Sequence, residues 1–361
     1  MNKIYLCGIL AMAAVASTSC SNEETRVNEP KSDAIEFGTY LGRDAESRAS
    51  VFTTGNMETA GFAVFASYTG DSDFSNQKMN FMYNQQVTYN VSAWKYTPLK
   101  YWPNNPGDKV SFFAYAPHGV LGAVNTPNEA QVTFTVQDAV ANQKDLVVAD
   151  ALKNLTKQAI TGNVNFTFKH VLARVGLNVE AMFDLVNDDA TGATDSNKDN
   201  GTKADGTIIN VTKVELIGKF DKDGVIDLTN STWSDVAAAG EDVIYTWQAA
   251  NFVSLVADNV TTTKQQLNNE ANYAMIIPQN VSGMKVKVTY TVTTTDASLN
   301  GGKSAIENVI TSEAFPFNFE QGKAYMFNLH LGMTSVKFTA SVSNWETGSQ
   351  TVVNLPINFN N

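Results

Sequence analysis

Apolar residues recur at every second position along most of this chain, and no other feature constrains the fold as strongly. This period is the one expected of β-strands with one buried face. No segment has the apolar spacing of a long helix. The clearest alternating or apolar runs lie at 35–41, 62–68, 110–115, 132–136, 146–148, 164–168, 171–179, 214–220, 243–247, 273–277, 286–292, 325–331 and 336–342. Many short strands separated by turns predict an all-β protein.

The parity of the alternation changes at His170. Apolar residues occupy even positions over 164–168 and odd positions over 171–179. A shift of one residue turns every following side chain to the other face of a sheet, so a bulge or a break between strands is expected here. The length of 361 residues suits two domains of ordinary size. We therefore predict two tandem β-sandwich domains, at 49–168 and 169–361.

The composition excludes two classes of protein. The chain is 43% hydrophobic, which is too apolar for intrinsic disorder. Lys and Arg number 25 against 36 Asp and Glu, which gives a net charge of −11. A nucleic-acid-binding protein needs a basic surface to displace counterions from phosphates, so nucleic acid is not an expected partner.

The sequence carries no motif for catalysis or metal binding. Its two cysteines lie in the first twenty residues, which leaves no disulfide and no cysteine nucleophile for the rest of the chain. His118, His170 and His330 stand singly, without a second histidine at metal-ligand spacing, and we expect structural roles for them. Neither Gly-x-Ser-x-Gly nor a phosphate-binding glycine loop is present. We therefore expect no enzyme activity, no cofactor and no metal.

The first twenty residues have the layout of an export signal. A short positive start precedes thirteen apolar residues, 4–16, which are too few to span a bilayer. Small residues and then Cys20 follow, which resembles a bacterial lipoprotein signal, although Ser17 stands where leucine is usual. An ordinary secretory signal is the alternative. We predict a signal peptide at 1–19, acylation of Cys20 with palmitate, and a polar tether at 20–33.

The two ends of the exported chain have strands with the same spacing. The first strand has one set of residues on a single parity: Ile35, Phe37, Thr39 and Leu41. The last, at about 351–361, has a matching set: Val353, Leu355, Ile357 and Phe359. Pro356 confines the last strand to a sheet edge or to a position that does not need its missing N–H. Each end could fill the same kind of groove, although the last strand could equally complete the sheet of its own domain.

A polar segment at 42–50 follows the first strand. It contains Arg43 and Arg48, which are two sites for a protease that cuts after basic residues. Solvated loop charges are the plain alternative for both residues.

Several motifs occur in an order that resembles the fimbrillin family of the Bacteroidetes. They are the lipoprotein signal, an early strand followed by Ser47-Arg48-Ala49, Trp94-Lys95-Tyr96, Lys100-Tyr101-Trp102-Pro103, Phe112-Phe113-Ala114-Tyr115-Ala116-Pro117, Phe168-Lys169-His170-Val171-Leu172-Ala173-Arg174 and Val342-Ser343-Asn344-Trp345. The resemblance spans essentially the whole chain. It implies a type V pilus subunit with two transthyretin-like β-sandwich domains. It also implies a lipidated precursor, cleavage by an Arg-specific protease after the first strand, and filling of the opened groove by the last strand of the next subunit.

Applied to this sequence, the resemblance gives each end of the chain a role. It implies cleavage between Arg48 and Ala49, with Arg43 as the alternative, and removal of the segment 34–48. The displaced strand would be Ile35 to Leu41 and the donor strand about 351–361. The expected partners are other copies or related pilus subunits joined head to tail, the processing protease, and the outer membrane through the lipid anchor before processing. The expected location is a fimbrium at the cell surface, reached through the periplasm and the outer membrane.

A second function is compatible with the same sequence. The protein could be a pilus tip or a free surface adhesin, with exposed aromatic rings that stack on glycan or protein. The candidate rings are Trp94, Tyr96, Tyr101 and Trp102. Core packing is the plainer account of these aromatic residues, since they lie on a strand-like stretch.

Overall fold

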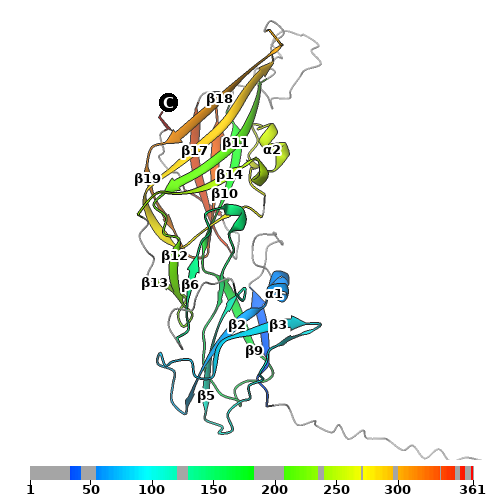
Figure 1. The fold of residues 1–361 in the computed structure, drawn as a ribbon, viewed down its shortest axis with the longest axis vertical. Helices are drawn as coiled ribbons and strands as arrows, with labels where there is room; N and C mark the ends of the chain where they lie inside the picture. Colours follow the sequence, from blue (N-terminus) through cyan, green and yellow to red (C-terminus); the bar gives the residue numbers. More distant parts are fainter. Residues whose placement is uncertain are drawn as a thin grey trace, which may run out of the picture. The chain divides into compact units, whose positions relative to one another are not determined.

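The computed structural model describes residues 33–41, 54–119, 129–182, 207–234, 240–269, 271–295, 300–333, 335–345, 350–353 and 359–360. These residues are mostly β-strand (Figure 1). The described helices are short: α1 (Thr54–Ala60), α2 (Ser254–Asp258), and the 3₁₀ turns η1 (Val140–Asn142) and η3 (Ala249–Asn251). The all-β prediction is confirmed. Several predicted site residues lie outside the described ones: Cys20, Arg43, Arg48, Ala49, Leu355 and Ile357.

Eight strands from the first half of the chain form one sheet, in the order β1-β9-β7-β5-β2-β3-β4, with β8 also paired to β5. Their bounds are β1 (Phe37–Leu41), β2 (Phe62–Gly70), β3 (Met82–Asn90), β4 (Ala93–Lys95), β5 (Lys109–Ala116), β7 (Val147–Ala149), β8 (Leu152–Leu155) and β9 (Val164–His170). The pairing of β1 with β9 is parallel, and the other described pairs of this sheet are antiparallel. β1 is therefore an edge strand added alongside an antiparallel sheet.

The two ends of this sheet curl toward each other. β1 and β4 stand at opposite ends of the strand order. Ala34, just before β1, nevertheless forms a bridge with Tyr101, just after β4. The amide of Ile35 also donates to the carbonyl oxygen of Lys100 at 2.9 Å. The segment at 34–41 therefore closes the gap between the two ends of the sheet.

The central strands of this sheet are buried on both faces. On β2, Phe62 and Val64 belong to one hydrophobic cluster, whereas Phe65 belongs to another. On β5, Phe112 and Phe113 divide in the same way. The first cluster lies inside the curled sheet, and the second continues into the other half of the chain. Simple alternation of buried and less buried residues therefore holds for β9 but not for β2 and β5.

The second half of the chain forms two six-stranded sheets. The first has the order β15-β10-β20-β21-β22, with β16 also paired to β10: β10 (Ala173–Ala181), β15 (Gln265–Gln266), β16 (Ala274–Ile276), β20 (Lys323–Leu331), β21 (Val336–Asn344) and β22 (Gln350–Val353). The second has the order β14-β11-β17-β18-β23, with β19 also paired to β17: β11 (Thr207–Gly218), β14 (Val243–Gln248), β17 (Gln279–Thr295), β18 (Lys303–Ser312), β19 (Phe315–Phe319) and β23 (Phe359–Asn360).

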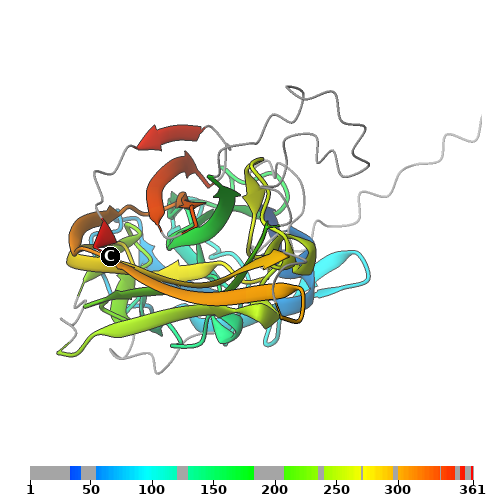
Figure 2. The same cartoon turned by 90° about the horizontal axis from the view of Figure 1, so that it is seen from above.

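These two sheets lie face to face (Figure 2). Aromatic and aliphatic side chains fill the space between them. The ring of Phe317 on β19 lies 5.2 Å from that of Tyr325 and 5.4 Å from that of Phe327, both on β20. Phe315 on β19 and Phe338 on β21 are 6.0 Å apart. Such edge-on and tilted pairs add to the stability that burial provides. The second half is thus a β-sandwich, as the alternation predicts.

A fourth sheet, of three strands, joins both halves of the chain. β6 (Gln131–Thr135) pairs with β12 (Asp223–Asp227), which pairs with β13 (Thr232–Ser234). Phe134 on β6 and Ile226 on β12 are both buried in the larger cluster. Residues 49–168 and 169–361 are therefore linked by a shared sheet and core as well as by the chain.

The parity change at His170 corresponds to a step between sheets. β9 ends at His170, and β10 begins at Ala173 in a different sheet. The indole N–H of Trp233 donates to the carbonyl oxygen of Val171 in this two-residue link, at 2.9 Å. The predicted break between strands is confirmed.

Candidate functional site

β1 lies at one edge of its sheet. It pairs with β9 alone, in a register that runs from Phe37 opposite Val164 to Leu41 opposite Phe168. An edge strand has a ladder on one side only, so its removal breaks one set of backbone hydrogen bonds and leaves β9 as the new edge.

The side chains before and along β1 fill a groove inside the curled sheet. Ile35, Phe37 and Leu41 are buried, Thr39 is half-buried and Tyr40 is 52% exposed. The ring of Phe37 has four aromatic neighbours, at centroid distances of 5.2, 5.6, 6.0 and 6.2 Å: Tyr96, Phe166, Phe112 and Phe62. Three of the four residues predicted for the displaced strand therefore anchor it.

The groove contacts the backbone of this segment as well as its side chains. The hydroxyl of Tyr96 donates to the carbonyl oxygen of Ile35 at 2.8 Å. The amide of Val164 donates to the carbonyl oxygen of Glu36 at 2.7 Å, and the side-chain amide of Asn163 donates to that of Phe37 at 3.2 Å. These donors point at atoms that every residue has, so they are equally available to another strand with apolar side chains at alternate positions.

The candidate aromatic binding residues mostly line this groove. Tyr96 and Trp102 are buried in the same cluster as Phe37, and Trp94 packs against that cluster. Trp102 lies 5.9 Å from Phe112. Tyr101 differs, because it is 56% exposed. The alternation of the sequence could not show that this stretch faces β1, because the contact depends on how the sheet curls.

The C-terminal strands lie on the edges of two different sheets. β22 pairs with β21, with Val353 opposite Ala340, and β23 pairs with β18, with Phe359 opposite Ser312. The start of the predicted donor strand thus extends one sheet of its own sandwich, and its end extends the other. Leu355 and Ile357 lie outside the described residues.

The three histidines have separate environments. His170 is buried, with Nδ1 2.8 Å from Oδ2 of Asp145. His330 pairs with Glu180, and its Nε2 lies 3.2 Å from the hydroxyl of Thr339. Burial lowers the pKa of His118. Over the part of the chain that the structure describes, no group of three or more His, Cys, Asp or Glu residues is placed to hold a metal ion.

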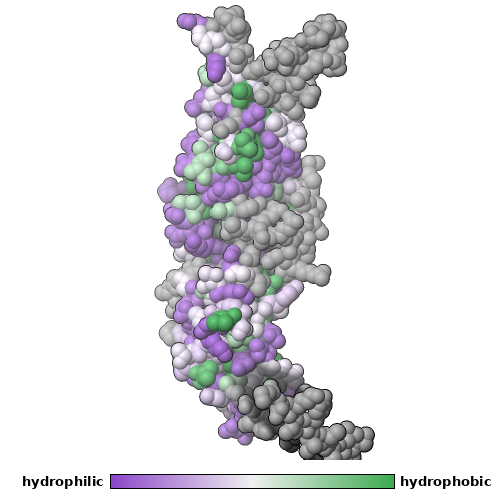
Figure 3. All heavy atoms as spheres, turned by 90° about the vertical axis from the view of Figure 1, so that its right-hand side faces the viewer, coloured by the Kyte–Doolittle hydropathy of each residue, from purple (hydrophilic) through white to green (hydrophobic). Residues whose placement is uncertain are grey.

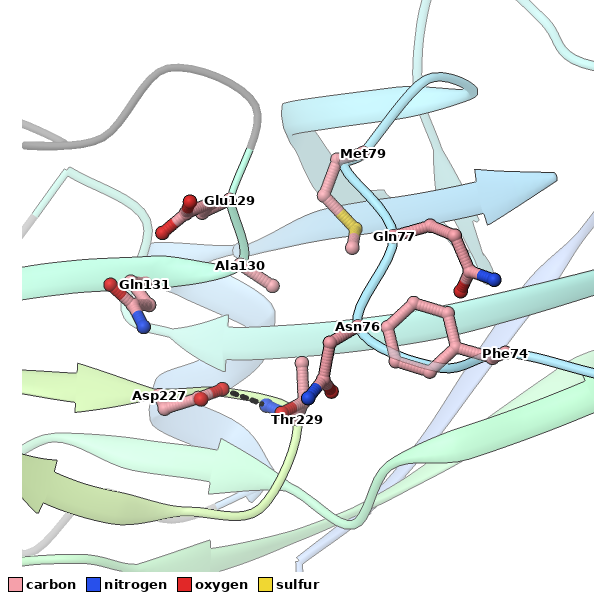
Figure 4. Close-up of a pocket in the computed structure, with 9 residues that line it drawn as sticks. All are labelled: Phe74, Asn76, Gln77, Met79, Glu129, Ala130, Gln131, Asp227 and Thr229. Carbon is pink, nitrogen blue, oxygen red and sulfur yellow. Dashed lines mark hydrogen bonds between the residues drawn. The ribbon is translucent and has the colours of Figure 1, made fainter. Parts of the chain in front are cut away.

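A pocket of about 190 Å³ lies between the loop that follows β2 and the ends of β6 and β12. It is lined by Phe74, Asn76, Gln77, Met79, Glu129, Ala130, Gln131, Asp227 and Thr229 (Figure 4). The amide of Thr229 donates to the carboxylate of Asp227 at 2.8 Å, so this acid is engaged by its own turn. Met79 and Ala130 are buried, and the other lining residues are at least partly exposed. The pocket is separate from the β1 groove.

Among the residues that the structure describes, no helix is both long enough and apolar enough to span a membrane. On the face in Figure 3, apolar residues are scattered between polar ones. Leu255 on α2 and Val91 in the turn after β3 are the most exposed of the large apolar side chains.

These features define a β-sandwich protein whose first and last described strands both lie on sheet edges. The chain belongs to the fimbrillin-like family, because the model of that family matches residues 47–345. The matched range begins after β1 and ends at Trp345, before β22.

Three proteins show what the chain is similar to. Over 96% of its length the chain is 26% identical to fimbrium subunit Fim1C of Phocaeicola vulgatus, of which it covers 98%. The fold is similar to that of a fimbrial protein from Bacteroides vulgatus, with a TM-score of 0.64 and 21% identity over 86% of this chain and 99% of that one. A solved structure of a candidate cell adhesion protein from Bacteroides uniformis aligns over 86% of this chain and 98% of that one, with 15% identity and a TM-score of 0.44.

Proposed function

We propose that this protein is a structural subunit of a type V fimbria that polymerises by donor-strand exchange and supports adhesion. The observation that carries the proposal is the position of β1. It is an edge strand that fills an aromatic groove, and a segment with Arg43 and Arg48 joins it to the rest of the chain. Membership of the fimbrillin-like family supports the fimbrial role. In this proposal the two halves of the chain are transthyretin-like domains.

The proposed precursor is a lipoprotein with acylated Cys20, exported through the periplasm to the outer membrane and the cell surface. An Arg-specific protease then cuts after Arg48, or after Arg43. Either cut removes the covalent link between β1 and the rest of the fold. β1 is then held only by its burial, its ladder with β9 and a few hydrogen bonds.

The energies of the two strands are similar enough to allow exchange. Burial of three large apolar side chains on the segment 35–41 gives a gross stabilisation of about 5–9 kcal/mol. A donor strand that inserts Val353, Leu355, Ile357 and Phe359 gives about 6–12 kcal/mol before ordering costs. A new strand also restores the ladder with β9. Because donor and acceptor are different surfaces of one subunit, the contact does not close on itself and produces a filament.

The N-terminus of the protein in purified surface filaments tests this proposal. We expect it to be Ala49, or Asp44 if cleavage follows Arg43. A subunit that retains acylated Cys20 and stays monomeric would contradict the assembly mechanism. A mutant host that lacks the protease provides the control, because it should accumulate the lipidated precursor.

A further inference from the structure

Two of the sequence motifs that carry the family resemblance meet in the folded chain. His170 ends β9, and Trp345 directly follows β21. Their rings stack with centroids 4.1 Å apart and planes within 3°. The guanidinium of Arg174 also lies over the Trp345 ring, 4.9 Å from its centre, and 4.6 Å from the centre of the Tyr273 ring. Two residues therefore hold Trp345: the last residue of β9 and the second residue of β10.

Burial and backbone hydrogen bonds reinforce this arrangement. Trp345 is 8% exposed and His170 is 5% exposed. Oδ2 of Asp145 lies 2.8 Å from Nδ1 of His170, on the ring that stacks on the indole. The amide of Trp345 donates to the carbonyl oxygen of Gly322 at 2.9 Å, and the amide of Gly322 donates to that of Leu172 at 3.1 Å. The side chain of Trp345 is thus tied to the ends of β9 and β10 that flank the link, and its backbone is tied to the link through Gly322.

The described strands beyond Trp345 both lie on sheet edges. β22 pairs only with β21, and β23 pairs only with β18 through Thr311 and Ser312. Both are edge strands, which have one neighbour and half the ladder of a central strand. Trp345 is thus the last buried residue described before these edge strands.

We propose that the stack of His170, Arg174 and Trp345, here named the Trp345 clamp, fixes the point at which the C-terminal segment separates from its own sandwich. The inference rests on the proposed strand exchange, and it defines how much of the chain is donated: residues beyond 345 leave, and Trp345 stays. Because His170 ends β9, the pairing partner of β1, the clamp also joins the acceptor groove to the base of the donor segment. Tension on an exchanged segment would therefore pass through Trp345 into β9.

Hydrogen exchange of the full-length monomeric precursor tests the clamp. Loss of the stacked ring and the cation–π contact in Trp345→Ala should speed exchange over 342–353 about tenfold, because local opening becomes easier. Trp345→Phe keeps a ring and should fall between this variant and the original chain. Trp233→Ala is the matched control, because it loses a hydrogen bond to the same link but does not precede the C-terminal segment. Hydrogen exchange over 342–353 in Trp233→Ala should stay the same as in the original chain.

Two outcomes would overturn the clamp. One is unchanged exchange over 342–353 in Trp345→Ala, and the other is an equal rise throughout the sandwich. If Trp345→Ala does not fold, Arg174→Lys is the variant that tests the clamp. It keeps the positive charge but loses the planar guanidinium that lies over the Trp345 ring. We expect faster exchange over 342–353 in that variant, and no change there would also overturn the clamp.

Failure of the clamp and failure of the proposed function give different results. The hydrogen-exchange measurement on the monomer does not depend on filaments. If it gives the expected pattern but the protein never assembles, strand exchange is refuted and the clamp remains as the anchor of the C-terminal segment. In filaments, the donated segment should begin after residue 345. Filaments in which β21 has also left its sheet would refute the clamp and leave strand exchange intact.

Discussion

Phe37 and Tyr40 are three residues apart on β1 and have opposite environments. Phe37 is 1% exposed among aromatic rings, whereas Tyr40 is 52% exposed. The alternation of the sequence placed Phe37 on the buried parity with Ile35 and Leu41. It could not indicate that the groove around Phe37 is built largely from rings, because Tyr96 and Phe166 come from distant parts of the chain.

This pair of residues gives a prediction at the residue scale. Phe37→Ala should destabilise the docking of β1 by about 3–5 kcal/mol, the usual cost of removing a buried phenylalanine. Tyr40→Ala on the same strand should change stability by less than about 0.5 kcal/mol, because its ring is largely in water. Urea unfolding of the full-length precursor, with hydrogen exchange of residues 34–41, measures both. Equal effects of the two substitutions would show that the aromatic groove does not hold β1.

At the scale of elements, the strands themselves could largely be predicted from the sequence, but their partners could not. The apolar residues at every second position predict β9 and the break at His170. Nothing local indicates that β1 pairs in parallel with β9, more than a hundred residues later, since pairing depends on contacts between distant segments. For the same reason, the sequence does not indicate the sheet that joins β6 to β12.

The C-terminal strands give a prediction at this scale. Deletion of residues 351–361 removes paired residues only from sheet edges, because β21 keeps its ladder with β20 and β18 keeps its ladder with β17. The shortened protein should therefore fold and remain a secreted monomer, with unchanged strand content by circular dichroism, but form no filaments. A variant with Asn354 and Asn358 replaced by Ser keeps the apolar positions and should still assemble. Filaments from the deletion variant would refute the donor role.

At the scale of the whole molecule, the described halves of the chain from Ala34 onward share a core. The larger hydrophobic cluster contains Phe65 and Phe113 from the first half together with Leu177 and Phe327 from the second. The sequence predicts two sandwich domains in tandem, because each half has enough strands for one. It could not show that β2 and β5 bury both faces, since a strand with two buried faces has no polar parity that marks it.

This shared core predicts a single unfolding transition. Ile226→Ala on β12 should lower the stability of the whole fold by about 2–5 kcal/mol, since Ile226 is fully buried beside the strand from the other half. Ile244→Ala is the matched control, because this isoleucine on β14 is 46% exposed. Scanning calorimetry of the full chain should show one peak that shifts only in the first variant. Two separate peaks, with one of them unmoved, would indicate halves that unfold independently.

The hydroxyl of Tyr96 donates a hydrogen bond to a backbone oxygen of the segment 34–41, and not to one of the side chains of that segment. Val164 and Asn163 do the same. In the proposed exchange, these backbone hydrogen bonds would form with any donor whose apolar residues fall at the positions of Ile35, Phe37 and Leu41. Subunits of diverged sequence would then be interchangeable along one fibre. A bacterium that varies the exposed surface of its subunits could in this way change what its fibres display without altering the joint between them.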